Sequence, residues 1–432
     1  MERRDDTREL AVEVGGMQSV RTAEIDRAET TRDSRLAFAA DLSAPWMPAL
    51  LIAVVYGIWV LAFLGSGHDA RALIRIGSKD ISRSHVSSII RPDPHYRYEP
   101  AGRDYDGQYY YFIAVDPLNA RYYLDSPTYR YTRIVYPMAA RVLAVGRASA
   151  VPIAMIVINW FAMTASVFLL GLWLRRRGLS SWLALIYGLY SGLFLAFTRD
   201  LTEPLAFTFA LLAVMLLDSP RMARIVGAGI AFGLAALTRE TAAVFGVIYA
   251  VSWLWHGGVA RRNSRIWIES GALMTLTLVP LMAWKAFLVV WLGPTDASTV
   301  LTPDPVPFRG LFAYYPWDAS RVLEVACVVI PGLVCGAVGL RALVRGERRV
   351  EVLCLVANVL LFVVFLNKAS YFNLTSSGRI SAGVVLAALL SLPRLSRIGA
   401  GRMTWLWVCA GLWTFLTPAL YIGYLVSGSS LS

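Results

Sequence analysis

The sequence predicts an all-α membrane protein whose helices cross the bilayer about eleven times. Hydrophobic residues make up 57% of the chain, charged residues make up 16%, and the mean hydropathy is +0.54. Soluble domains carry about 25% charged residues, so this composition indicates that much of the surface faces lipid. The apolar runs lack the alternation of a transmembrane β-barrel, which leaves helices as the spanning elements.

The predicted spans are eleven apolar segments separated by polar connectors. Most have roughly 17 to 25 residues, a length that crosses about 30 Å of hydrocarbon as a helix. Their ranges are 46–65, 150–174, 180–198, 204–217, 225–238, 241–257, 266–292, 322–340, 352–366, 380–393 and 403–427. The fourth, fifth and tenth are short, so they either re-enter the membrane from one side or extend into their polar flanks.

Arginine placement predicts the orientation, because positively charged connectors stay in the cytoplasm. Every second connector is basic, with Arg175, Arg176, Arg177, Arg221, Arg224, Arg261, Arg262, Arg265, Arg345, Arg348, Arg349, Arg394, Arg397 and Arg402. The N-terminus is therefore expected inside and residues 66–149 outside. These connectors also account for most of the net charge of +12, so the expected partner is the bilayer and not nucleic acid. The scarcity of lysine is typical of GC-rich bacterial coding and favours a bacterial plasma membrane.

Residues 1–45 are charged, mixed in sign and poor in aromatic residues, so we expect a cytoplasmic, largely disordered leader before a transmembrane domain at 46–427. The first apolar run begins too late and is too long for a cleaved signal peptide. All cysteines fall inside predicted spans and should be buried and reduced: Cys327, Cys335, Cys354 and Cys409. Neither the cysteines nor the histidines have metal-ligand spacing. No cofactor is predicted, and a divalent cation stays open as an alternative.

The external loop 66–149 carries the densest polar chemistry of the chain, including the pair Asp104 and Asp106. In soluble nucleotide-sugar transferases an Asp-x-Asp pair holds a metal against a diphosphate. Nucleotide sugars are cytoplasmic and this loop is predicted outside, so the pair favours a lipid-carried donor, with one Asp as general base on an acceptor hydroxyl. The alternative is an N-cap or an interface ion pair with Arg103.

Two segments of this loop, 108–115 and 132–147, mix apolar and polar residues at helical spacing. We expect both to be amphipathic helices in the membrane interface. A second external segment, 293–320, contains several prolines and aromatic residues and is predicted to form a lid over a cavity. Its aromatic residues also suit a plain interfacial belt.

Short external connectors place further charges directly beside apolar spans, where they cost free energy unless something uses them. These residues are Arg199, Asp200, Glu203, Arg239, Glu240, Lys368 and Arg379. The guanidinium fork binds phosphate oxygens and stays charged near lipid, so the arginines are candidates for a phosphate site. The alternative is local neutralisation, of Arg239 by Glu240 and of Arg199 by Asp200 or Glu203.

Three short stretches resemble the GT-C superfamily of polytopic glycosyltransferases, especially mannosyltransferases of the PIG-V type. Residues 106–114 resemble that family's W-D-x-x-W-Y-x-x-I-A signature, although Tyr105 and Tyr109 stand where the family has tryptophan. Residues 200–204, Asp-Leu-Thr-Glu-Pro, and residues 238–240, Thr-Arg-Glu, resemble two further motifs.

The resemblance implies a polyprenyl-phosphate-linked sugar as donor, a lipid, glycan or protein acceptor, and an inverting reaction outside the cytoplasm. Asp106 would be the base, with Asp104 as the competing assignment. The implied phosphate-binding residues are Arg239, Arg379, Arg133 and Arg130, and the supporting residues are Asp200, Glu203, Glu240, Gln108 and Tyr109. The implied fold is a helical bundle roofed by the first external loop.

Two other functions fit a chain of many spans. A lipid or solute transporter, or flippase, requires polar residues along a path through the membrane, whereas the non-connector charges here concentrate toward one side. A non-catalytic membrane assembly protein requires no base, so Asp106→Asn would leave its function intact.

Overall fold

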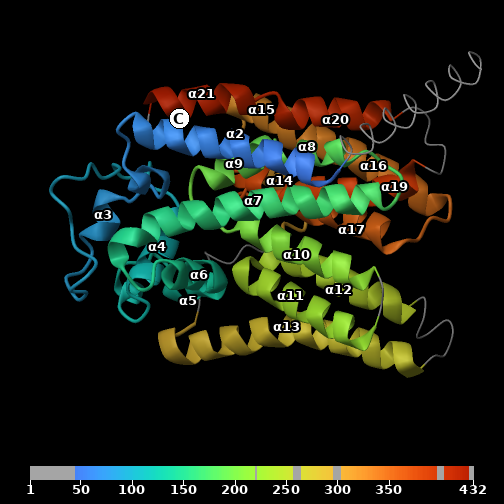
Figure 1. Cartoon of the computed structure of the whole chain (residues 1–432), viewed down its shortest axis with the longest axis horizontal. Coiled ribbons are helices and arrows are strands. Elements are labelled where there is room, and N and C mark those ends of the chain that lie inside the picture. Colours follow the sequence, from blue (N-terminus) through green and yellow to red (C-terminus); the bar gives the residue numbers. More distant parts are fainter. Residues whose placement is uncertain (1–43, 219–220, 256–263, 295–302, 397–402, 428–432) are drawn as a thin grey trace, which may run out of the picture.

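The computed structural model describes residues 44–218, 221–255, 264–294, 303–396 and 403–427 as an assembly of helices (Figure 1). The α-helices among them are α2 (Trp46–Gly65), α3 (Ser78–Ile81), α4 (Gly107–Val115), α5 (Pro127–Arg130), α6 (Val135–Leu143), α7 (Val151–Arg175), α8 (Leu185–Gly188), α9 (Ser191–Phe197), α10 (Glu203–Leu217), α11 (Met222–Thr238), α12 (Ala243–Trp253), α13 (Ser264–Leu292), α14 (Arg309–Phe312), α15 (Ala319–Glu324), α16 (Ile330–Val344), α17 (Val350–Val359), α18 (Leu374–Ile380), α19 (Ala382–Leu395), α20 (Thr404–Thr414) and α21 (Thr417–Ser427). The predicted leader, apart from residues 44 and 45, lies outside the described residues.

Six helical segments in the described part of the chain are long and apolar enough to cross a membrane. They are Trp46–Gly65, Ala148–Arg175, Ser264–Leu292, Ala319–Val344, Leu374–Leu395 and Thr404–Val426. The predicted class of helical membrane protein therefore stands. The short tenth span lengthens into its N-terminal polar flank, which was one of the two predicted alternatives.

The other predicted spans are helical but shorter, so a count of eleven crossings stays a prediction. The third is divided between a 3-10 turn, α8 and α9. The fourth, fifth, sixth and ninth correspond to apolar helices of 10 to 17 residues, Glu203–Leu217, Met222–Thr238, Glu240–Trp253 and Val350–Val364.

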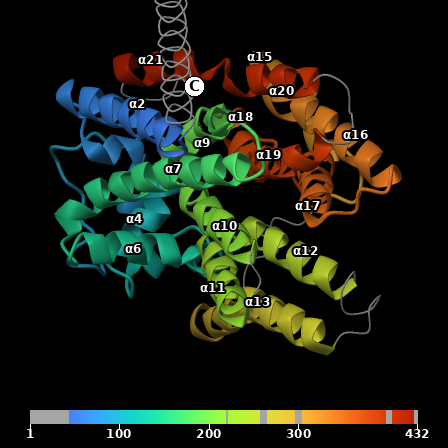
Figure 2. The ribbon, with the colours of Figure 1, turned by 45° about the vertical axis from the view of Figure 1, so that its right-hand side comes forward.

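Two groups of helices flank α7 (Figure 2). On one side α10 packs against α11, and α11 packs against α13. On the other side α19 contacts α7 and α17, and α16 packs against α17 and α20. The helix α19 is enclosed by its neighbours, because 13 of its 14 residues are buried. Its apolar side chains belong to the hydrophobic core.

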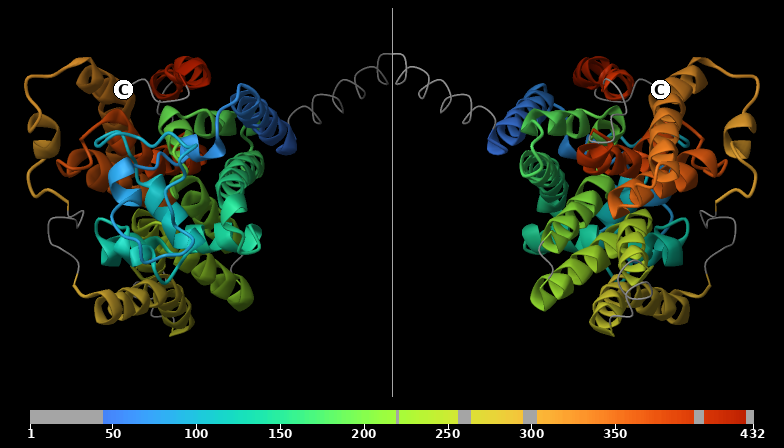
Figure 3. Two further views of the ribbon diagram at one scale, coloured as in Figure 1. Left: turned by 90° about the vertical axis from the view of Figure 1, so that its left-hand side faces the viewer. Right: turned by 90° about the vertical axis from the view of Figure 1, so that its right-hand side faces the viewer.

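The loop 66–149 folds into short helices, α3 to α6, that lie together across one end of the bundle (Figures 1 and 3). Both predicted helices of this loop exist, but the interfacial assignment is wrong for α4. Eight of its nine residues are buried, since α6 and α7 cover it. In α6, Tyr136, Pro137 and Ala140 are buried while Val142 and Leu143 are 74% and 51% exposed, so the interfacial position of this helix stays a prediction.

Ion pairs show which connectors share an end of the bundle. Arg177 pairs with Asp218, which joins the connectors after the second and fourth predicted spans. At the opposite end, Asp106 of the first loop pairs with Arg379. The alternation inferred from arginine placement therefore matches the relative positions of these connectors, and the side facing the cytoplasm stays a prediction.

Candidate functional site

Asp106 lies directly before α4, at the point where the loop 66–149 meets the connector between α9 and α10. A Cβ atom on Gly107 would lie 2.3 Å from the carbonyl oxygen of Arg199, so glycine is what permits this close approach. The first turn of α4 is thereby held against the connector that carries Arg199 and Glu203. Asp106 is therefore placed beside the connector between α9 and α10, from which it is distant in sequence.

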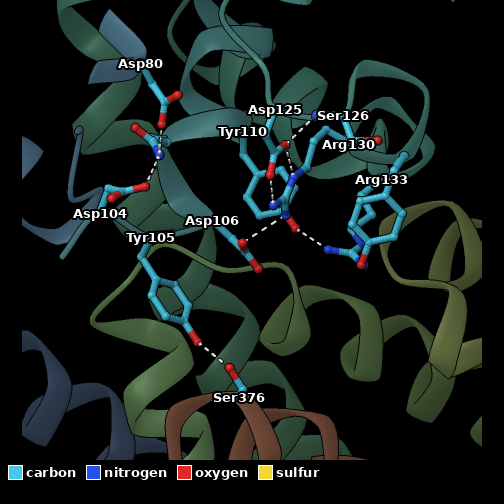
Figure 4. Close-up of polar contacts among 12 residues, drawn as sticks. Asp80, Asp104, Tyr105, Asp106, Tyr110, Asp125, Ser126, Arg130, Arg133 and Ser376 are labelled. Carbon is cyan, nitrogen blue, oxygen red and sulfur yellow. Dashed lines mark hydrogen bonds and ion pairs between the residues drawn. The ribbon is translucent and has the colours of Figure 1, made fainter. Parts of the chain in front are cut away.

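The Asp106 carboxylate accepts from two arginines that come from different parts of the chain. Arg130 Nη1 lies 2.9 Å from Asp106 Oδ1, and Arg379 Nη2 lies 2.7 Å from Asp106 Oδ2. Asp125 anchors the other side of the Arg130 fork, with an Nη2–Oδ2 distance of 2.6 Å (Figure 4). The ring of Tyr109 lies 4.2 Å from the centre of the Arg130 guanidinium. Each carboxylate oxygen of Asp106 therefore has its own cation.

Glu203 extends this network into the bundle. Its side chain is fully buried and lies 2.9 Å from Arg239 Nη1 and 3.4 Å from Arg379 Nη1. Pro204 in the first turn starts α10 here, and Arg239 follows the end of α11 in an extended conformation. Arg379 therefore connects Asp106 to Glu203, and two helix ends supply the remaining partners.

Arg133 and Glu240 complete the network, with an Nε–Oε2 distance of 3.1 Å. Arg133 is 2% exposed and also donates to the hydroxyl groups of Tyr110 and Tyr129. The predicted neutralisation of Arg239 by Glu240 is wrong. The two residues are adjacent in sequence but pair with Glu203 and Arg133 instead.

We call these eight side chains the charged centre: Asp106, Asp125, Glu203, Glu240, Arg130, Arg133, Arg239 and Arg379. It holds four carboxylates and four guanidiniums, so its formal charges balance without a ligand. Burial opposes ionisation of Asp106, but Arg130, Arg379 and Arg133 outweigh it and hold the pKa of Asp106 well below its ordinary value. Asp106 is therefore a carboxylate throughout the neutral pH range.

Asp104 points away from the charged centre, although it is only two residues from Asp106 (Figure 4). Its Oδ2 accepts from the Gln108 amide at 3.1 Å, and that amide also donates to Asp80 Oδ2 at 2.9 Å. Its Oδ1 accepts from the backbone of Gly102, so the predicted ion pair with Arg103 is not formed. Gln108 thus supports Asp104 and not Asp106. The geometry separates the two aspartates into different environments.

Asp200, another predicted supporting residue, is fully buried. It belongs neither to the charged centre nor to the hydrogen-bonded group of Asp80, Asp104 and Gln108. Its carboxyl group lies beside Asn159, and burial raises the pKa of Asp200 well above its ordinary value. The predicted pairing of Arg199 with Asp200 or Glu203 is also wrong. Arg199 Nε instead donates to the Tyr424 hydroxyl at 3.3 Å, and its guanidinium lies 4.4 Å from the Tyr105 ring centroid.

Comparison with family models, curated proteins and solved structures finds no match to this chain. The site is therefore interpreted from its chemistry. Within the described ranges, no group of three or more His, Cys, Asp or Glu side chains is placed to hold a metal ion. Three buried arginines and the half-buried Arg130, interleaved with carboxylates, are suited to phosphate or carboxylate groups, which the planar fork binds through paired hydrogen bonds.

A cavity of about 550 Å³ is lined by Tyr105. Tyr105 also touches the charged centre, because its ring lies 5.3 Å from the Arg379 guanidinium, and its hydroxyl is 3.0 Å from Ser376 Oγ. Asp104 lines the cavity and Asp106 does not. From the predicted lid at 293–320, Ser320 lines the cavity, and residues 295–302 lie outside the described residues.

Three residues important to this geometry were missed from the sequence as site residues. Asp125 has no motif around it, and only its spacing of five from Arg130 hints at an ion pair. Tyr105 was noted as a departure from a family pattern, not as a residue that lines a cavity and contacts Arg379. Asp80 is separated from Asp104 by 24 positions along the chain, and only the fold brings them together.

Proposed function

We propose that the charged centre transfers a sugar from a polyprenyl-phosphate donor to an acceptor hydroxyl, with inversion at the anomeric carbon and Asp106 as the base. The observation that supports this most is the double ion pair of Asp106 with Arg130 and Arg379. It places one carboxylate directly beside two guanidiniums, as proton removal and stabilisation of a phosphate leaving group together require.

In the proposed reaction the acceptor oxygen attacks the anomeric carbon while its proton passes to Asp106. The bond from the anomeric carbon to the lipid phosphate oxygen breaks, and polyprenyl phosphate leaves with the electron pair. Asp106 loses its negative charge as the phosphate gains one. Arg130 and Arg379 therefore exchange one anion for another, and the charge balance of the centre is kept through the step.

The remaining members of the charged centre have positioning roles in this proposal. Glu203 holds Arg239 and Arg379 where water does not reach them, and Glu240 holds Arg133. Asp104 serves as support for the loop through Gln108, and Asp106 takes the role of base.

The test is donor consumption by the purified full-length protein in lipid nanodiscs. Polyprenyl-phosphate donors carrying different radiolabelled sugars are supplied with extracts containing acceptors. We expect one donor to release polyprenyl phosphate in a one-to-one ratio with labelled product. Release from no donor, or movement of the intact donor across a vesicle membrane without release, would overturn the proposal and favour a transporter or assembly function.

A further inference from the structure

The cavity beside Tyr105 has a wall of mixed character. Its apolar lining comes from α9, α15, α18, α21 and the turn before α21, through Leu195, Leu323, Leu374, Leu416, Ala419 and Leu420. Its polar lining includes three arginines, Arg75, Arg103 and Arg199, against one aspartate, Asp104. A volume of about 550 Å³ falls within the about 300–1,000 Å³ typical of small-molecule sites.

Arg199 is the most unusual group in this wall. It is 7% exposed, and among the described residues no carboxylate lies within the 4.0 Å of an ion pair. Its polar contact is the Tyr424 hydroxyl, and its other partner is the face of Tyr105. A buried guanidinium without a counter-charge is costly, and these two neutral partners offset only part of that cost.

The charge balance differs between the charged centre and the cavity. The arginines of the charged centre are matched by carboxylates, so an added anion there must displace one of them. Arg199 has no such competitor and lines the cavity. It therefore brings a positive charge without an ion-pair partner into a cavity with a largely apolar lining.

We propose that this cavity binds an anionic amphiphile, with a phosphate head group on Arg199 and an aliphatic chain along the apolar lining. Free phosphate shares the head-group chemistry but leaves the apolar wall unused. The inference rests on the cavity alone and does not require sugar transfer. It goes beyond the proposed function in assigning anion binding to Arg199, outside the charged centre.

The test is direct binding to the full-length protein in nanodiscs, measured by native mass spectrometry and by radioligand titration. Three probes separate the sources of the chemistry: farnesyl phosphate, farnesol as the chain without the anion, and inorganic phosphate as the anion without the chain. We expect saturable binding of farnesyl phosphate and at least about tenfold weaker binding of the other two, which corresponds to about 1.4 kcal/mol. Equal binding of farnesol or of inorganic phosphate would contradict the proposal.

Two variants test the assignment of the site. Arg199→Met should weaken farnesyl phosphate binding at least about tenfold, because it removes a charge-assisted contact. Ala419→Trp fills the cavity from an exposed position on α21, so it should weaken binding without loss of the fold. The matched controls are Arg341→Met and Ile422→Trp, at exposed positions that do not line the cavity.

Wild-type affinity for farnesyl phosphate in both Arg199→Met and Ala419→Trp would overturn the inference. Loss of binding in Arg379→Met alone would also contradict it, because the phosphate would then bind in the charged centre. Failure of the proposed function has a different signature. A protein that binds farnesyl phosphate through Arg199 but consumes no sugar donor loses the proposed function and keeps this inference. A protein that transfers sugar but keeps wild-type farnesyl phosphate affinity in both Arg199→Met and Ala419→Trp keeps the proposed function and loses this inference.

Discussion

Asp106 has two properties that would act against each other in the proposed reaction. Its position between Arg130 and Arg379 suits a group that must be ionised before it accepts a proton. The same arginines hold its pKa below the ordinary value of 3.8, which weakens it as a base in the ligand-free protein. In the proposed reaction a donor phosphate draws these arginines away, and the pKa of Asp106 rises as the substrate binds.

This account predicts a specific pH dependence. Removing the Arg130 charge removes the largest attraction on the Asp106 carboxylate, so Arg130→Gln should raise the pKa of Asp106. Protonation would then reach Asp106 at higher pH, and the acid limb of kcat/KM, which reports the free enzyme, should move upward. In wild type Asp106 should cause no acid limb above about pH 5.

The measurement is a pH profile of kcat/KM from about pH 4.5 to 8 for both proteins. Arg141→Gln serves as the control, because Arg141 donates to the carbonyl oxygens of Ala114 and Val115 and does not contact Asp106. An unchanged acid limb in Arg130→Gln would show that Asp106 is not the titrating base. Since the folded pKa is depressed, the stability that Asp106 contributes should be lost only below about pH 4.

At the scale of elements, the site depends on close backbone approach at the start of α4. Gly107→Ala would place a methyl group 2.3 Å from the Arg199 carbonyl oxygen, so α4 must shift. We expect a loss of about 1–3 kcal/mol in stability from overpacking. A displacement of Asp106 near 1 Å should lower turnover by about 100-fold.

Thermal unfolding and turnover of Gly107→Ala are compared with those of Gly411→Ala. A Cβ on Gly411 in α20 has nothing within 4 Å, so alanine there should be neutral or stabilising by about 0.5–1 kcal/mol. Equal stability and turnover in both variants would contradict the proposed role of the α4 contact. A similar approach joins α9 to α18, where a Cβ on Gly192 would lie 2.4 Å from the Gly378 carbonyl oxygen.

At the scale of the whole molecule, the sequence predicted the helical membrane class and the residues that gather at one end. Hydropathy and arginine placement are properties of sequence segments, so the helical membrane class can be predicted from them without the three-dimensional structure. The ion pairs within the charged centre could not be predicted from the sequence, because Arg239 and Glu203 come together only when α10 packs against α11. Nearest neighbours in sequence, such as Arg239 with Glu240, gave the wrong pairs.

The proposed choice of Asp106 over Asp104 rests on the three-dimensional structure. Two residues of the same type at a spacing of two look equivalent in a sequence. Asp106, directly before α4, pairs with Arg130 and Arg379. Asp104 instead shares the Gln108 amide with Asp80. The two aspartates therefore differ in partners and charge, and this difference is testable in the intact protein.

The most direct test of the central claim is kcat/KM for sugar transfer by Asp106→Asn, Asp104→Asn and the distant loop control Asp116→Asn. Each variant is first shown to have wild-type thermal stability and size-exclusion behaviour. We predict a loss of at least about 100-fold for Asp106→Asn, as for removal of a general base, and less than about tenfold for the other two. Wild-type turnover in Asp106→Asn, or a loss confined to Asp104→Asn, would contradict the assignment of Asp106 as the base.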